Sequence, residues 1–131
     1  MNKLFTGSSD RIIIKWDLDT FNKEHVFDSF HSGEINSLIF LNEEKIIVSG
    51  SEDKFINFFD TKTCSQIGTV EFDYSVLCLT KNREESKIIC GGKDTQDLRI
   101  WNVSSVLKFC QEHMKFLRRV DTEKSLSLIH I

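Results

Sequence analysis

The chain has no proline and only six glycines among its 131 residues, so no residue without a backbone donor interrupts its apolar segments. The spacing of its four cysteines excludes a zinc ribbon, because none of them form a Cys-x-x-Cys pair. They are Cys64, Cys78, Cys90 and Cys110. No apolar run approaches the roughly 18 residues of a membrane span, and no apolar segment follows Lys3 to make a signal peptide. We therefore expect a cytoplasmic or nuclear protein with free, buried thiols.

No charge of one sign dominates either, since 17 Lys and Arg residues stand against 20 Asp and Glu residues. A net charge of −3 gives no electrostatic reason to expect nucleic acid as a partner. No His, Asp or Glu residues follow metal-ligand spacing, and Gly91-Gly-Lys93 lacks the spacing of a phosphate-binding loop. We expect no cofactor, no metal, no nucleic acid and no membrane partner.

Three segments of the chain repeat one another at a period of about 42 residues. They span residues 7–17, 50–60 and 91–102. Each begins with Gly, passes an Asp in a turn, and ends in an apolar run with an aromatic residue. The turn residues, 43 and 41 positions apart, are Asp10, Asp53 and Asp94. The aromatic residues, 43 and 42 positions apart, are Trp16, Phe59 and Trp101. A fixed period of about 40–45 residues that ends in Trp-Asp is typical of β-propeller blades.

Short apolar segments separated by polar turns predict an up-and-down antiparallel sheet in each unit. In the middle unit we expect strands over residues 34–40, 45–49, 55–59 and 66–70. In the first unit we expect strands over 4–6, 11–16 and 25–30, and in the third over 75–80, 87–90 and 98–101. Gly50 stands where the following turn would favour a positive φ. The predicted fold is all-β, an incomplete β-propeller of about three four-stranded blades.

The predicted units are a partial repeat over 1–34 and two further repeats over 35–75 and 76–112, the last with a degenerate final strand. Residues 113–125 would begin a further blade or a helix. Between 103 and 120, Val106, Cys110 and His113 fall at helical spacing, whereas the repeat requires a strand near 106–111 and places His113 where His31 stands. We favour the strand.

The last six residues, Leu-Ser-Leu-Ile-His-Ile over 126–131, do not continue the repeat. They resemble a translation of the transposase mosaic-end sequence used in sequencing libraries. Our hypothesis is that this tail is not natural protein, and the alternative is an ordinary apolar C-terminus. Genomic coding sequence that matches these six residues would contradict the hypothesis.

The three units resemble WD repeats over roughly residues 4–120. In that family a His, a Ser or Thr, an Asp and a Trp form a structural hydrogen-bond relay within each blade. The resemblance implies that His31, Ser49 and Asp53 form this relay in the middle unit, where Phe59 replaces Trp and ends it at the hydroxyl. It implies the same role for Thr6, Asp10, Trp16, Asp94 and Trp101 in the other units, although Cys90 stands at the hydroxyl position of the third.

His31, Ser49 and Asp53 are the residue types of a catalytic triad. The resemblance implies a structural role instead, and we predict no catalytic residue in this chain. It implies a non-enzymatic scaffold that binds proteins or peptides through the loops beside the Asp turns. The candidate contact residues, which could equally be solvated charges, are Arg11, Glu34, Glu52, Lys54 and Lys93.

Two other interpretations stay open. The chain could be an accessory propeller of a multidomain enzyme, such as a kinase, a ubiquitin ligase or a nucleotide-binding protein, or it could be a decayed copy. Propellers close with about 4–8 blades, so we expect other parts of the same polypeptide to supply the remaining blades. We also expect residues 1–125 alone not to form a stable monomer, because unpaired sheet edges and uncovered faces favour association.

Overall fold

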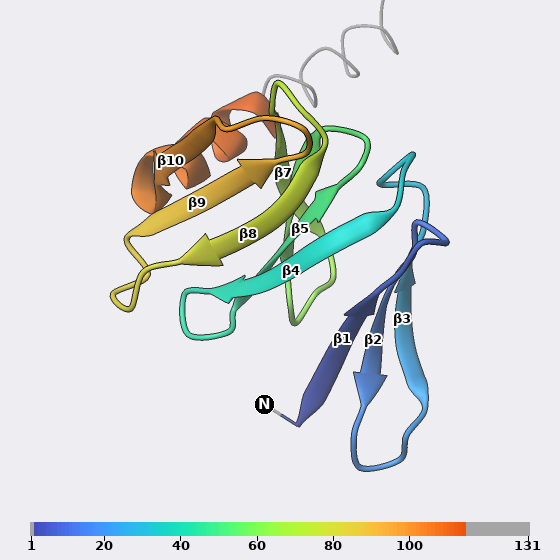
Figure 1. Ribbon diagram of the computed structural model, residues 1–131. Coiled ribbons are helices and arrows are strands. Elements are labelled where there is room, and N and C mark those ends of the chain that lie inside the picture. The colour runs from blue at the N-terminus through green and yellow to red at the C-terminus, as the bar shows by residue number, and fades with distance from the viewer. Residues whose placement is uncertain (1, 115–131) are drawn as a thin grey trace, which may run out of the picture.

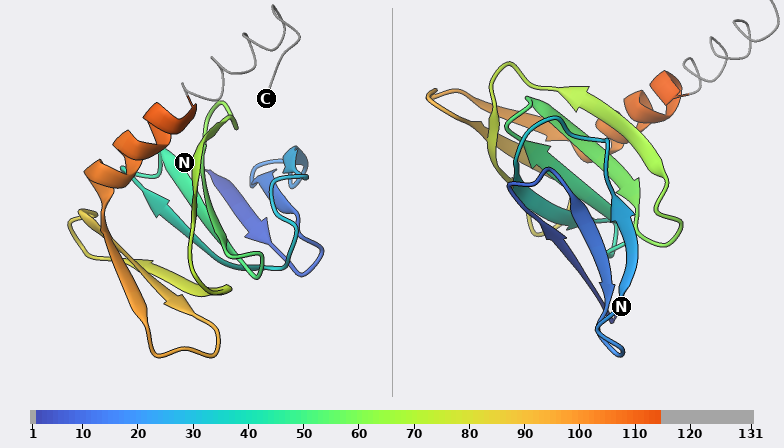
Figure 2. Two further views of the ribbon diagram at one scale, coloured as in Figure 1. Left: turned by 90° about the horizontal axis from the view of Figure 1, so that it is seen from above. Right: turned by 90° about the vertical axis from the view of Figure 1, so that its right-hand side faces the viewer.

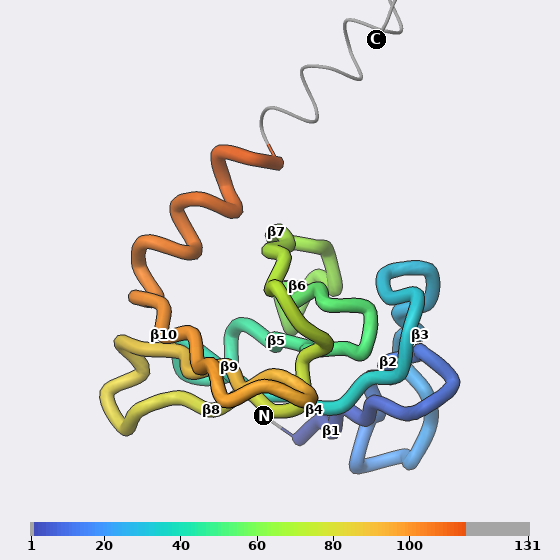
Figure 3. The backbone as a smooth tube through the Cα atoms, turned by 45° about the horizontal axis from the view of Figure 1, so that its top comes forward, coloured from blue at the N-terminus to red at the C-terminus, as the bar shows by residue number. Residues whose placement is uncertain are grey.

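The computed structural model describes residues 2–114, which form ten strands in three antiparallel sheets and one helical segment (Figure 1). The three sheets stack side by side, with the four-stranded sheet in the middle (Figure 3). One apolar cluster joins the first sheet to the middle sheet, and another joins the middle sheet to the third. This arrangement confirms the predicted all-β, open propeller.

The first sheet consists of β1 (Lys3–Gly7), β2 (Ile13–Asp17) and β3 (Lys23–Phe27), in that spatial order. Its side chains alternate between two faces, as the pleat of a strand requires. Phe5, Ile13 and Phe27 are buried against the middle sheet, whereas Leu4 and Val26 on the other face are exposed. One face of this sheet is therefore covered and one is open.

The middle sheet consists of β4 (Ile35–Leu41), β5 (Ile46–Ser51), β6 (Phe55–Asp60) and β7 (Gln66–Glu71) in sequence order. Every residue of β5 is buried, because sheets cover both of its faces. A strand covered on both faces reads as a continuous apolar run rather than as an alternation. This explains the run Ile46-Ile-Val48.

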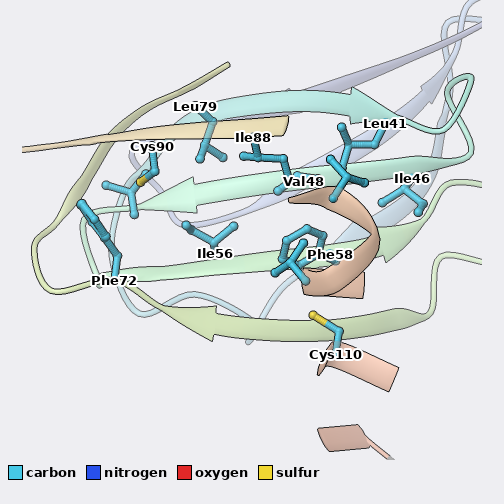
Figure 4. Close-up of a cluster of buried hydrophobic side chains, with 13 residues drawn as sticks. Leu41, Ile46, Val48, Ile56, Phe58, Phe72, Leu79, Ile88, Cys90 and Cys110 are labelled. Carbon is cyan, nitrogen blue, oxygen red and sulfur yellow. The ribbon is translucent and has the colours of Figure 1, made fainter. Parts of the chain in front are cut away.

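The third sheet consists of β8 (Val76–Lys81), β9 (Lys87–Gly92) and β10 (Leu98–Asn102), ordered β10-β9-β8. Val76, Leu79, Ile88 and Cys90 pack against the middle sheet (Figure 4). The first sheet has the three strands expected of a partial repeat, the middle sheet has the expected four, and the third has three over the described residues, without the fourth strand that the repeat required.

Our preference for a strand near residues 106–111 is wrong, because residues 103–114 are helical. Asn102 caps this segment through its Oδ1 atom, which accepts a hydrogen bond from the amide of Ser104 at 3.1 Å. Val103, Val106 and Cys110 then bury one helical face in the cluster of the middle and third sheets. His113 lies on this segment, stacked on Phe109, and not in a position equivalent to His31. The proposed tail over 126–131 lies outside the described residues.

Gly7 and Gly50 permit close packing between sheets and do not supply a positive φ, so our expectation for Gly50 is wrong. A Cβ atom on Gly7 would lie 2.5 Å from Cγ2 of Ile35, and one on Gly50 would lie 2.5 Å from Cγ1 of Val76. The positive φ falls instead on Lys54, at 76°. Each glycine therefore lets the first strand of the next sheet approach the backbone.

The cysteines correct in part the expectation that the thiols are buried. All four are free; Cys90 and Cys110 are buried, Cys64 is half-buried, and Cys78 is exposed. Cys78 is exposed because it pairs with Gly91 on the face of the third sheet that points away from the middle sheet.

We predict that Gly68→Ala lowers the free energy of unfolding by about 1–3 kcal/mol, the range typical of an overpacked core. The new Cβ would lie 2.3 Å from Cβ of Cys110, which belongs to the helical segment and has little freedom to move. Gly91→Ala is the matched control, because there the new Cβ meets only the terminal sulfur of Cys78, at 2.8 Å. Urea unfolding measures both, and equal stabilities would show that the helix does not pack on β7.

We also predict that Cys90 and Cys110 resist alkylation at pH 8 until the chain unfolds. Burial raises the pKa of both thiols to about 11, so about one thiol in a thousand is ionised at that pH, and only the thiolate reacts. Iodoacetamide labelling followed by peptide mass spectrometry, with and without urea, measures this. Rapid labelling of either cysteine without urea would contradict the packing in Figure 4.

Candidate interaction surface

A buried hydrogen-bond relay lies in the middle sheet. Nδ1 of His31 is 2.9 Å from Oδ2 of Asp53, and Nε2 is 2.7 Å from Oγ of Ser49. The carboxylate can only accept, so Nδ1 carries the proton and Nε2 accepts from the Ser49 hydroxyl. This direction keeps the hydroxyl proton inside the relay. His31 and Ser49 are both buried, so the relay is largely closed to solvent.

The Asp53 carboxylate fixes two loops at once. Its Oδ2 atom accepts from the amide of Ser32 at 2.9 Å, and its Oδ1 atom accepts from the amide of Phe55 at 2.9 Å. Ser32 lies before β4, and Phe55 begins β6. The relay therefore holds the loop before the sheet against the turn between β5 and β6.

Asn57 is a relay residue that the sequence analysis missed. Its Nδ2 atom donates to the carbonyl of Phe30 at 3.0 Å and lies 3.2 Å from Nε2 of His31. Phe59 offers no N–H group and fills an aromatic cluster with Phe27 and Phe30. Asn57 thus adds an amide donor beside His31 that bonds the Phe30 carbonyl, whereas the Trp16 indole of the first sheet donates to a hydroxyl. The sequence could have indicated this role, because Asn57 is the one polar side chain within the apolar run Phe-Ile-Asn-Phe-Phe.

The first sheet holds part of the same relay. Nε1 of Trp16 donates to Oγ1 of Thr6 at 2.9 Å. The Asp10 carboxylate accepts hydrogen bonds from the Ser8 hydroxyl and from the amide of Ile12. Both hydrogen bonds lower the pKa of Asp10, and the bond from the Ser8 hydroxyl has the larger effect. Asp10 thereby organises its turn as Asp53 does in the middle unit.

The third sheet replaces the relay with an aromatic contact. The Trp101 ring packs edge-on against Phe72, with ring centroids 6.4 Å apart, and Phe72 occupies the repeat position of His31. The Cys90 thiol is buried at the hydroxyl position. Asp94 is exposed and has a φ of 57°. Asp94 and Trp101 are therefore not joined by a hydrogen-bond relay, because Phe72 and Cys90 stand where the relay needs a His and a hydroxyl.

Backbone hydrogen bonds connect the loops along one edge of the stacked sheets. The amide of Ile35 donates to the carbonyl of Ser8, and the amide of Glu52 donates to the carbonyl of Glu34. The Ser75 hydroxyl donates to the carbonyl of Glu52, and the Ser75 carbonyl accepts from the amide of Lys93. We call this row of loops, over residues 8–12, 31–35, 51–54 and 92–95, the loop edge.

The five predicted contact residues all lie on the loop edge, but two of them pair with each other. Nζ of Lys93 lies 2.8 Å from Oε1 of Glu52. The hydrogen bond to Lys93 lowers the pKa of Glu52 and raises that of Lys93. This pair links the middle and third sheets. Arg11, Glu34 and Lys54 are exposed.

The described residues also contain an apolar groove of about 530 Å³ between β7, β10 and the helical segment. Over residues 2–114 no three His, Cys, Asp or Glu side chains gather as metal ligands. No helix within that range is long and apolar enough to cross a membrane.

The family model "WD domain, G-beta repeat" matches residues 22–60, from just before β3 to the end of β6. This part of the chain is therefore a WD repeat, and the chain is similar to WD-repeat proteins. The matched WD repeat thus begins with the last strand of one sheet and continues through three strands of the next.

Curated WD-repeat relatives extend the match along most of the chain. It is 27% identical to the Dictyostelium discoideum tRNA (guanine-N(7)-)-methyltransferase non-catalytic subunit wdr4, over 69% of this chain and 22% of that protein. It is 26% identical to a guanine nucleotide-binding protein subunit beta-like protein of Encephalitozoon cuniculi, over 79% of this chain and 33% of that protein. The chain spans between 9 and 33% of the length of the curated relatives it matches.

A solved structure agrees with this fold. A chain of the crystal structure of the mitotic checkpoint complex superposes with a TM-score of 0.71 at 19% identity, over 77% of this chain and 32% of that one. At this identity the likeness concerns the fold alone.

We predict that Ser49→Ala destabilises the WD-repeat chain by about 1–3 kcal/mol, the cost of leaving a buried polar group without its partner. The substitution removes the hydroxyl that donates to His31 Nε2. Thr6→Val is the control, because it removes the equivalent hydroxyl from a half-buried position where water reaches the Trp16 indole. Thermal unfolding measures both, and a larger loss for Thr6→Val would contradict the structural role of the buried relay.

Proposed function

We propose that this chain is a non-catalytic scaffold that binds protein or peptide partners through the loop edge. The observation that carries the proposal is that the relay and the inter-loop backbone hydrogen bonds hold these loops in fixed positions. A rigid frame that presents loops is a common arrangement for binding. Fixed loops also lose little conformational entropy when a partner binds.

The exposed charges of the loop edge are the proposed contacts. Arg11, Glu34 and Lys54 extend from loops whose backbones are tied down, whereas Glu52 and Lys93 hold neighbouring sheets together. Arg11 and Lys54 occupy equivalent positions in successive units, each directly after the turn Asp, and both have positive φ values, 72° and 76°. We assign these two cations to partner binding, and the paired residues to support of the loops.

One relative is named as a non-catalytic subunit, and another is named as a pre-mRNA-splicing factor. These names support an intracellular location, cytoplasmic or nuclear, for this chain as well. A second candidate function is an accessory propeller of a multidomain enzyme. It is favoured by a 30% identical match to 9% of the probable di- and tripeptidase DUG2 of Saccharomyces cerevisiae. A catalytic motif in a longer native transcript would support this second candidate.

We predict that the double substitution Arg11→Glu with Lys54→Glu lowers recovery of partners by about tenfold, which corresponds to about 1.4 kcal/mol of binding free energy. The assay is affinity capture from cells with quantitative mass spectrometry. The control is Lys62→Glu with Arg83→Glu, an identical charge change on exposed turns away from the loop edge. Equal losses in the two variants, or none in the first, would contradict binding through the loop edge.

A further inference from the structure

The outer strand of the third sheet has a free edge over the described residues. In the other two sheets this edge is paired, β2 with β3 and β6 with β7, whereas β10 pairs only with β9. After Asn102 the chain turns into the helical segment (Figure 2). This segment packs on β7 where Cys110 contacts Gly68. The continuation of the chain to residue 114 thus leaves the edge of β10 uncovered.

This edge lacks the features that usually prevent pairing between molecules. Sheet edges are commonly protected by proline, by a bulge or by unpaired charge. The chain has no proline, and the pairing of β9 with β10 is regular, whereas both other outer pairs contain a register shift. The charged residue of β10, Arg99, already pairs with Asp73 at 2.8 Å.

The edge is also apolar and accessible. Leu98 is 66% exposed and Ile100 is 61% exposed, both on the face that points away from the middle sheet. On the opposite side the groove of about 530 Å³ adjoins β10, and its wall includes Phe109, which is 53% exposed. The side chains of a strand added at this edge would therefore find open space on both faces of the sheet.

We propose that a second copy of this chain pairs its β10 antiparallel with this edge, about a twofold axis through Ile100. The two third sheets would then form one continuous six-stranded sheet. Antiparallel pairing of an edge with itself is self-complementary, as the common twofold dimers require. The proposal concerns a different surface from the loop edge and does not depend on the scaffold function.

The side chains of β10 select this register. With Ile100 opposite its own copy, each Arg99 lies opposite Trp101 of the second copy, a pairing of a cation with an aromatic face. Within one chain the Arg99 guanidinium already lies 5.9 Å from the centre of the Trp101 ring. An axis through Arg99 would place two like charges directly opposite, which is unfavourable. An axis through Trp101 would place Arg99 opposite residue 103, where the strand has ended.

The test is the mass in solution of the 131-residue chain, by size-exclusion chromatography with light scattering. We expect twice the mass of one chain for the unsubstituted protein. Ile100→Lys should raise the dissociation constant at least about tenfold, because two like charges would meet at the axis. Ile100→Glu should do the same. An equimolar mixture of the two variants should recover the dimer, as a heterodimer in native mass spectrometry, because opposite charges then meet there.

Leu77→Lys is the matched control. Leu77 is an exposed aliphatic residue of the same sheet, 51% exposed, but it lies on β8, at the opposite edge of the sheet from β10. This variant should remain dimeric. Far-UV circular dichroism confirms folding of each single variant, and recovery of the heterodimer on mixing does so independently.

Several outcomes would overturn the proposal. One is a monomer at every concentration, and another is a dimer that Ile100→Lys does not weaken. A third is a mixture of the two charged variants that fails to associate. Polydisperse aggregates indifferent to residue 100 would also overturn it, as would a longer natural form that is monomeric because its own strand covers β10.

Discussion

The stacking of sheets on both faces of the middle sheet is the constraint on which the rest of the structure depends. A sheet of three or four short strands cannot bury its own apolar faces, and each face needs a neighbour. The middle sheet has two, which is why β5 is buried at every residue and contains Ser49 and Gly50 at its centre. Both residues are suited to a strand that is covered on both faces. Gly50 allows Val76 to approach, and Ser49 needs His31 because water cannot reach it.

Burial also explains why the relay differs between units. In the middle unit His31 and Ser49 lie between two sheets, so their polar atoms must be paired within the protein. Where Phe59 occupies the place of Trp16, the Asn57 amide lies beside Nε2 of His31 and donates to the carbonyl of Phe30. In the third unit Cys90 and Phe72 remove most of the polar atoms instead, and an aromatic contact to Trp101 fills the space. The same buried space is thus filled by hydrogen-bonded polar side chains in the middle unit and by apolar side chains in the third.

Most of the fold could be predicted from the sequence, because the repeat and the alternation of apolar residues report the same strands. The contacts of His31 with Ser49 and Asp53 followed from their repeat positions, whereas Asn57 did not, since nothing local distinguishes a buried amide from an exposed one. The repeat failed after Asn102. There, helical periodicity and an N-cap were both present, but the decisive contact, Cys110 on Gly68, joins residues 42 positions apart.

That failure has consequences beyond secondary structure. A strand after Asn102 would have paired with β10 and completed the third sheet, as β7 completes the middle one. Over residues 2–114 the helical segment instead covers part of β7, and Leu98 and Ile100 stay exposed on a strand that is paired on one edge alone. Burial of Val106 and Cys110 therefore stabilises the middle sheet while the backbone groups on one side of β10 stay available. Because the chain departs from the repeat here, unpaired backbone N–H and C=O groups and exposed apolar side chains lie together on β10. This combination favours binding of another β-strand, which can satisfy both the backbone groups and the apolar side chains.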